Sequence, residues 1–404
     1  MRLSMRTNKG FTLIEVIVVM VVFVVVISIA ASALQTMLSK GGIVLKSEES
    51  NIEGVIGLEM FRHDLAQAGL GLFTDPESVP TFAEAAGVPA ATYNDASAVP
   101  RAIVTGNNLT LGNNAIVLTG TDYMAIKATT VARNATAQQW TYINDAGVPH
   151  QWGVNDFNDN TNKMVVMSQK YSKSLNEVVR TLIQISADNY AISYDAAGVF
   201  RDKDGYDTDF YTPTSGKLHY LYGIGTDSVA FTLRAPFNRA DYYVRRVVNE
   251  TPAVCSPATG VLYKMNMSHA NGAMTPPIPM LDCVADMQII LGWNTQADPV
   301  ASNSIDAFSD ASGQNTTGVT NGLNLSSIMQ NATELRKRLR QIKVYLLAQD
   351  GPQDRNFRNT NTMFVLGDTN LGETPLTSTI DLTTANMVNY RWKMYRIVVR
   401  PRNI

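Results

Sequence analysis

Twelve consecutive apolar residues near the N-terminus, Val16–Ile27, limit most strongly how this chain can fold. The apolar region around them, Phe11–Leu34, covers 24 residues and would be about 36 Å long as an α-helix. That length crosses a hydrocarbon layer of about 30 Å with some tilt. Arg2, Arg6 and Lys9 precede the region, and basic flanks favour the cytoplasmic side of a membrane. The sequence therefore predicts one membrane-spanning helix, with the rest of the chain beyond the membrane.

Glu15 is the one charged residue within this apolar region. A charge inside a membrane helix costs about 2.5–3.5 kcal/mol even on insertion-based scales, so an intramembrane carboxylate indicates a function and requires a partner. Cleavage between Gly10 and Phe11 would create an α-amine on Phe11, one helical turn from Glu15. The carboxylate could pair with this amine in its own chain, or with the amine of a neighbouring subunit in an assembly.

The segment Gly10–Glu15 has the sequence Gly-Phe-Thr-Leu-Ile-Glu and precedes the long apolar helix. It resembles the class III signal of type IV pilins and type II secretion pseudopilins. The resemblance implies that a membrane-bound prepilin peptidase cuts after Gly10 and methylates Phe11. Glu15 would then be the fifth residue of the mature chain.

Two other interpretations of the apolar region remain open. A plain membrane anchor has the same hydropathy, but it gives no reason for Glu15. A secretory signal is supported by Ala31-Ser32-Ala33, which has the small-x-small form of a signal-peptidase site. The apolar region is longer than a usual secretory core, so the class III interpretation is favoured.

The chain of 404 residues carries a net charge of −2, and removal of the basic leader would make it −5. A mildly acidic chain is not expected to be a general nucleic-acid binder. Cys255 and Cys283 lie on the side of the membrane predicted to be oxidising, which favours a disulfide over two buried thiols. The disulfide would close a loop of about 29 residues and contribute about 3–4 kcal/mol in the chain-entropy model.

Residues 35–72 are expected to continue the helix as an amphipathic segment. Its apolar stripe at helical spacing consists of Leu58, Phe61, Leu65, Ala68 and Leu72. Charged residues are expected on its other faces, namely Glu48, Glu49, Glu53, Glu59, Arg62 and Asp64. Its internal glycines, Gly41, Gly42, Gly54 and Gly57, either weaken the helix or permit close packing. Glycines at 69 and 71 indicate its end.

Beyond the helix, short apolar or alternating runs are separated by Gly, Asn, Asp and Pro, which is the pattern of β-structure. The expected strands are Ala115–Leu118, Met124–Ala128, Lys163–Met167, Thr181–Ile185, Val229–Leu233, Asp241–Val248, Val261–Met265, Met287–Leu291, Ile342–Ala348 and Met394–Val399. Residues 79–100 are expected to form a loop because they are rich in Ala and Pro. The polar residues 294–331 are a candidate mobile segment.

The expected fold is α+β: a long N-terminal helix, half transmembrane and half amphipathic, packed on a large β-rich globular domain in the lollipop arrangement of pilins. Its expected parts are a leader at residues 1–10, a transmembrane helix at 11–34, an amphipathic helix at 35–72 and a periplasmic or extracellular domain at 73–404. An insertion is expected around residues 75–235.

Several further segments resemble PilW-type minor pilins, and their order extends over most of the chain. They are 64–69 (Asp-Leu-Ala-Gln-Ala-Gly), 242–244 (Tyr-Tyr-Val), 262–264 (Leu-Tyr-Lys), 281–288 (Leu-Asp-Cys-Val-Ala-Asp-Met-Gln), 335–347 and 395–403. Each piece is weak by itself. The region 75–235 shows little of this pattern, which is why it is expected to be an insertion.

No catalytic motif is found in the sequence. A Ser nucleophile elbow, a zincin helix and a phosphate-binding loop are absent, and the four His have no metal-ligand spacing. Gly223-Ile224-Gly225 lacks the third glycine of a nucleotide-binding fingerprint and is expected to be a turn. The chain is therefore predicted not to be an enzyme.

An acidic loop at residues 202–209 is a candidate calcium site. Asp202, Asp204, Asp207 and Asp209 alternate around Gly205, and calcium prefers six to eight oxygen ligands. The spacing is not that of an EF-hand because no Glu stands at the twelfth position. A solvated hairpin tip explains the same residues without a metal, and this interpretation is favoured.

Two basic clusters stand in the C-terminal third of the chain. They consist of Arg336, Lys337, Arg338, Arg340 and Lys343, and of Arg391, Lys393, Arg396, Arg400 and Arg402. An acidic partner or lipid headgroups could bind there. A solvated face that leads into a strand is the favoured interpretation for both clusters.

Taken together, the residues and the resemblance predict a minor type IV pilin, a structural subunit of a pilus (fimbrium). It is expected in the bacterial inner membrane before assembly and in the pilus at the cell surface afterwards. The resemblance implies contacts with other minor and major pilins and with prepilin peptidase, and a role in priming assembly at the tip, with a tip adhesin as a candidate partner. Twitching motility and cell adhesion are the implied processes. A type II secretion pseudopilin and a tip-located adhesive or ligand-binding module are the alternatives.

Overall fold

The computed structural model describes residues 12–404 except 97, 145, 153–160, 196, 203–217, 227–232, 384–385 and 404, and the side chains of 36, 39–53 and 113 are also outside the description. The described chain divides into two compact units, Met1–Ile52 and Glu53–Ile404. The first unit contains most of helix α1 (Leu13–Gln67), and the last turns of α1 belong to the second unit.

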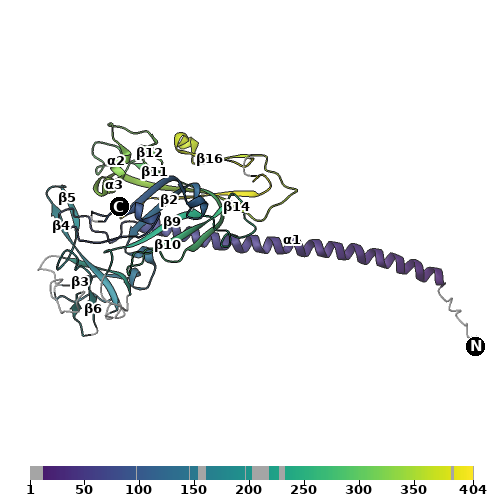
Figure 1. The fold of residues 1–404 in the computed structure, drawn as a ribbon, viewed down its shortest axis with the longest axis horizontal. Coiled ribbons are helices and arrows are strands. Elements are labelled where there is room, and N and C mark those ends of the chain that lie inside the picture. Colours follow the sequence, from purple (N-terminus) through teal and green to yellow (C-terminus); the bar gives the residue numbers. More distant parts are fainter. Residues whose placement is uncertain are drawn as a thin grey trace, which may run out of the picture. The chain divides into compact units, whose positions relative to one another are not determined.

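The second unit is built around a nine-stranded antiparallel sheet (Figure 1). Its main path is β1 (Ile103–Leu111), β2 (Val117–Ala128), β9 (Asn238–Arg245), β10 (Gly260–Asn266), β11 (Ile278–Trp293), β12 (Ala307–Ser309) and β13 (Thr316–Thr317). Strand β14 (Leu339–Asp350) pairs with β11 and with β17 (Arg391–Val399). The sheet thus pairs strands that are far apart along the chain, since Tyr123 on β2 lies opposite Tyr243 on β9.

A second sheet is formed by residues in the middle of the chain. Its order is β3 (Trp140–Ile143), β8 (His219–Thr226), β4 (Asn162–Ser172) and β5 (Glu177–Leu182). Two small hairpins add β6 (Ser193–Tyr194) with β7 (Phe200–Arg201), and β15 (Met363–Leu366) with β16 (Ser378–Asp381). The short helices are α2 (Leu325–Met329) and α3 (Ala332–Arg338), and the 3₁₀ turns are η1 (Ala90–Tyr93), η2 (Gly112–Asn114), η3 (Thr130–Ala132), η4 (Thr136–Gln138), η5 (Thr369–Leu371) and η6 (Thr374–Leu376). The expected α+β class, one long helix with a β-rich domain, is confirmed.

The apolar stripe of α1 is buried in the second unit, as its spacing predicts. Phe61, Leu65 and Ala68 have no exposed surface, and the ring of Phe61 stacks on Tyr242 of β9 with centroids 4.1 Å apart. Gly57 explains how the helix comes so near the sheet, because a Cβ there would lie 2.0 Å from the carbonyl oxygen of Met280. This glycine therefore permits close packing.

The end of α1 follows the sequence signal. The helix stops at Gln67, and Gly69 and Gly71 adopt positive φ angles of 84° and 68°. Glycine reaches this left-handed region without the steric penalty that a side chain would add. The chain then turns so that the N–H of Gly69 donates to the carbonyl oxygen of Lys127 at 2.9 Å.

Residues 79–100 contain little regular structure, and buried charges hold them against the sheet. Lys127 on β2 lies 2.7 Å from Glu84 and 2.6 Å from Asp95, and Arg239 on β9 lies 3.2 Å from Glu84. Both cations and Glu84 have no exposed side-chain surface. Buried charges require partners of opposite sign, and this segment supplies them.

One expectation about local structure is corrected, and one strand was not expected. Gly223-Ile224-Gly225 lies within strand β8 and is not a turn. A Cβ on Gly223 would come within 1.9 Å of the carbonyl oxygen of Thr136, so this glycine permits a close approach of two backbones. Strand β1 was not expected because Gly and Asn interrupt its apolar residues, and its register shifts between Gly106 and Leu109.

The polar segment 294–331 contains β12, β13 and α2. Its side chains hydrogen-bond to its own backbone and to one another. Asn294 donates to the carbonyl oxygens of Pro299 and Ser302 at 3.2 and 2.6 Å, and the hydroxyl of Thr295 bonds Asp306 at 2.9 Å. Hydrogen bonds of polar side chains therefore stabilise this segment, where apolar packing stabilises other parts of the domain.

Candidate functional site

The first part of α1, Leu13–Gln35, is long and apolar enough to cross a membrane. Every residue from Thr12 to Gln35 is exposed, so this apolar surface is covered by nothing else in the described chain. The hydroxyl groups of Ser28 and Ser32 donate to helix carbonyl oxygens at 2.8 and 2.9 Å, which satisfies them without water. Lipid or the helices of other subunits are the environments that suit such a surface.

Glu15 lies in the first turn of α1 and caps the helix. Its Oε2 accepts hydrogen bonds from the backbone N–H of Thr12 at 2.9 Å and from the Thr12 hydroxyl at 3.0 Å. In the other direction, the N–H of Glu15 donates to the carbonyl oxygen of Thr12 at 3.1 Å. This arrangement resembles a capping box, in which the third helical residue satisfies the N–H of the N-cap. Within the described residues, Oε1 makes no such bond, so the carboxylate retains an open acceptor.

Several sequence-predicted site residues lie outside the described residues. Gly10 and Phe11 precede them, and Asp204, Asp207 and Asp209 fall in a gap of the description. Asp202 is described and buried, and Asn189 donates to its carboxylate at 3.4 Å. Among the described residues, no group of three or more His, Cys, Asp or Glu could hold a metal ion. Calcium binding at residues 202–209 therefore stays a prediction.

Asp64 fixes the end of α1 to the sheet through a buried carboxylate. Lys264 on β10 donates to it at 2.5 Å, Tyr242 on β9 at 2.6 Å, and Arg133 through two nitrogens at 3.1 and 3.0 Å. The Asp64 and Lys264 side chains are each about 1% exposed. Because three donors from three separate segments share one carboxylate, the group orients the helix on the sheet.

Electrostatics at this carboxylate follow from burial and charge. Burial lowers the pKa of Lys264, and the charge of Asp64 opposes that shift. Burial and the negative charge of Asp64 together raise the pKa of Tyr242 well above its usual value. Tyr242 therefore remains a neutral donor, and Lys264 depends on Asp64 for its counter-charge.

The role of Asp64 was not predicted from the sequence, which placed it on a charged outer face. The signal was present in the spacing. Asp64 follows Phe61 by three residues and precedes Ala68 by four, and both neighbours are fully buried. Residues at these spacings share one helix face. A carboxylate at this position of the apolar face therefore indicates a buried group that needs a cation.

Cys255 and Cys283 form a disulfide in the structure. It joins the connection before β10 to β11, and both cysteines are buried.

The two basic clusters contain both buried and exposed side chains. Lys343 is buried on β14 and pairs with Glu373, which corrects the expectation of a solvated face at that position. Arg396 remains exposed and lies 3.2 Å from Asp368.

Comparisons with known proteins give one finding, and it concerns the N-terminus. The family model "Prokaryotic N-terminal methylation motif" matches residues 5–31. A search of curated proteins gives no match, and a search of solved structures also gives none. The matched segment contains Gly10, Phe11, Glu15 and most of the apolar run. It supports a type IV pilin-like or pseudopilin-like protein, which is generally structural, and it fits a chain anchored in the inner membrane.

Proposed function

We propose that this chain is a minor type IV pilin of the PilW type, a structural subunit that primes pilus assembly and sits at the tip. The observation that carries the proposal is a carboxylate, Glu15, at the start of an exposed apolar helix within a matched methylation motif. The β-rich domain after residue 73 is bulky for a subunit that repeats along a thin filament, which favours the tip.

The proposed mechanism begins with processing. Prepilin peptidase removes residues 1–10 and methylates the new amine of Phe11. In the inner membrane, with the β-rich domain on the periplasmic side, Glu15 then pairs with the N-terminal amine of a neighbouring pilin. The described geometry supports this step because Oε2 caps the helix through Thr12 while Oε1 has no bond within the described part of the chain. One carboxylate can therefore cap its own helix and accept a second partner.

The partners in this proposal are other minor and major pilins, with a tip adhesin as a further candidate. No catalytic and no nucleic-acid role is proposed.

A type II secretion pseudopilin is the second candidate because it shares the same methylation motif. Deletion of the gene discriminates between them: loss of pili supports the pilin, and loss of protein secretion with intact pili supports the pseudopilin. Intact pili that no longer adhere would instead support an adhesive tip module.

Substitution of Gly10 tests the processing step. Gly10→Leu should leave the leader attached, because a bulky side chain replaces the small residue before the scissile bond. The measurement is the mass of the N-terminal peptide of the membrane-extracted protein. Ser4→Leu is the matched control, since it makes a similar change in the leader away from the bond. A mature N-terminus at Phe11 in Gly10→Leu, or at Leu34 in the parent, would contradict the class III assignment.

Calcium binding by the acidic loop at residues 202–209 is a separate proposal. Titration calorimetry of the full chain in detergent should show binding of calcium, and Asp204→Ala should remove the heat because it deletes one carboxylate ligand. Asp298→Ala, at an exposed carboxylate elsewhere in the chain, is the control and should leave the heat unchanged. Absence of heat in the parent protein would end the calcium proposal.

A further inference from the structure

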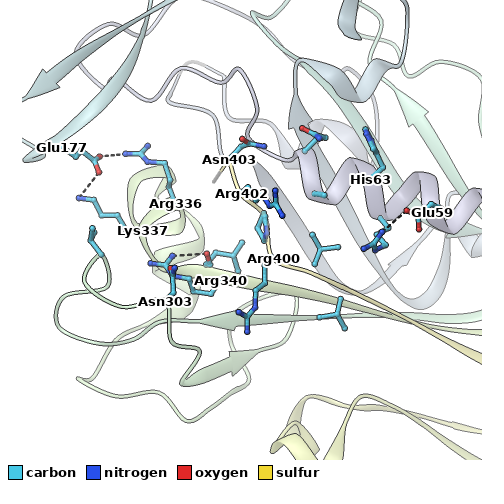
Figure 2. Close-up of a pocket in the computed structure, with 18 residues that line it drawn as sticks. Glu59, His63, Glu177, Asn303, Arg336, Lys337, Arg340, Arg400, Arg402 and Asn403 are labelled. Atoms are coloured by element: carbon cyan, nitrogen blue, oxygen red, sulfur yellow. Dashed lines mark hydrogen bonds and ion pairs between the residues drawn. The ribbon is translucent and has the colours of Figure 1, made fainter. Parts of the chain in front are cut away.

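A groove of about 1170 Å³ opens in the second unit, where the two basic clusters meet the last turns of α1 (Figure 2). Arg336 and Lys337 come from the end of α3, and Arg340 comes from the start of β14. Arg400 and Arg402 follow β17. These side chains are separated by about 60 residues in the sequence, but the pairing of β14 with β17 brings their segments together.

The groove is strongly positive although the chain as a whole is slightly negative. Six Arg and Lys side chains line it, against two Glu, Glu59 and Glu177. The net charge of the whole chain is −2. A concentration of one sign of charge in a concave surface raises the local concentration of oppositely charged partners. The net charge of the chain does not reveal this surface, although the two basic clusters stand out in the sequence.

The acidic residues neutralise only part of the groove. Glu177 pairs with Arg336 and with Lys337, and Glu59 pairs with Arg62 at 2.8 Å. Arg400 and Arg402 are exposed, and within the described residues neither makes an ion pair or a side-chain hydrogen bond. Both guanidinium groups are therefore available to a ligand.

Arg340 is held in place at the floor of the groove. Its two terminal nitrogens donate to the carbonyl oxygens of Leu339 at 3.2 Å and Pro299 at 2.7 Å, while its buried Nε has no hydrogen-bond partner among the residues that the structure describes. Burial lowers the pKa of Arg340, and the positive charge of Arg338 lowers it further. Burial likewise lowers the pKa of Arg180, and Arg336 adds to that shift. Burial is the main cause of both shifts, and a neighbouring arginine adds to each.

We infer that the groove binds a carboxylate-rich segment of another polypeptide. Arginine forks bind carboxylates through two parallel hydrogen bonds, which suits Arg400 and Arg402. The groove exceeds the usual volume of a small-molecule site, about 300–1000 Å³, so an extended chain fits it better than a single anion. Glu59 and Glu177 are already engaged in ion pairs with basic residues, so they add little repulsion against such a segment.

The lining residues argue against single-stranded nucleic acid as the occupant. Such sites combine basic grooves with aromatic side chains on which the bases stack. Among the described lining residues there is no Phe, Tyr or Trp. The inference concerns the globular domain alone and does not depend on the assembly role proposed for Glu15.

The test measures binding of a fluorescein-labelled octaglutamate peptide to the full chain in nonionic detergent, by fluorescence anisotropy. The parent should bind octaglutamate and not octaglutamine. Arg400→Gln with Arg402→Gln should weaken binding at least about tenfold, because two charge-assisted contacts are lost. Raising the salt from about 0.1 to about 1 M should weaken binding in the parent, since the screening length falls from about 10 to about 3 Å.

The matched control is Arg355→Gln with Arg358→Gln, which removes the same charge from exposed positions outside the groove. It should bind octaglutamate within about twofold of the parent, since distant exposed charges are largely screened. Equal loss in both double variants would overturn the inference, and so would absence of binding in the parent. Tighter binding of a single-stranded oligonucleotide or of anionic phospholipid vesicles would assign the groove to that class instead. The far-ultraviolet circular dichroism of each variant should match the parent.

Discussion

Replacement of Glu15 by Gln should leave processing and membrane insertion intact but exclude the protein from filaments. The amide can still accept the hydrogen bonds from Thr12 that cap the helix, so only the negative charge is lost. An amine and a carboxylate about 4 Å apart attract each other by about 4 kcal/mol at an effective dielectric constant of about 20. Loss of that attraction would reduce incorporation by up to about a thousandfold. The measurement is the amount of the protein in sheared filaments relative to membranes.

Thr12→Ala is the matched control for Glu15→Gln. It removes the hydroxyl that donates to Glu15 and weakens the cap, but it keeps the carboxylate. Loss of a helix cap costs about 1 kcal/mol, which is small for a helix that the membrane also stabilises. Thr12→Ala should therefore enter filaments at nearly the parent level. Normal incorporation of Glu15→Gln, with exclusion of Thr12→Ala, would show that Glu15 acts only as a cap.

Substitution of Asp64 by Asn should produce the largest loss of stability in the β-rich domain. The amide cannot neutralise Lys264, whose ammonium group is about 1% exposed, or Arg133 beside it. Removal of one partner from a buried ion pair costs about 3–5 kcal/mol because the remaining charge is uncompensated. The expected result is a lower urea midpoint of the full chain in detergent, followed by near-ultraviolet circular dichroism.

Glu59→Gln is the control for Asp64→Asn on the same helix. Glu59 is exposed and pairs with Arg62, one turn away, so its replacement should cost less than about 1 kcal/mol. A second test is the double variant Asp64→Asn with Lys264→Met, which removes both charges. It should recover part of the stability lost in Asp64→Asn. Equal midpoints for Asp64→Asn and Glu59→Gln would refute the role assigned to Asp64.

Helical spacing accounts for the features of α1 that could be predicted. The apolar stripe from Leu58 to Leu72 is buried where the spacing places it, and the helix ends before Gly69. Strands with continuous apolar runs, such as β10 and β14, were also expected near their observed bounds. Strands β1 and β8 were not predicted because glycines interrupt their apolar residues. In β1 the register shifts after Gly106, and in β8 Gly223 lies close to the backbone of Thr136, and neither feature has a local sequence pattern.

The sequence by itself determined an apolar segment long enough to span a membrane, its carboxylate and the β-rich class of the remainder. These features follow from local spacing and composition, since hydrophobic length and helical periodicity are properties of neighbouring residues. Only the tertiary structure decided that Lys343 is buried, and that Arg340 and Arg402 line one groove. Those outcomes depend on which strands pair. The pairing of β14 with β17 joins residues about 50 apart, and burial of the resulting sheet, not any local pattern, selects it.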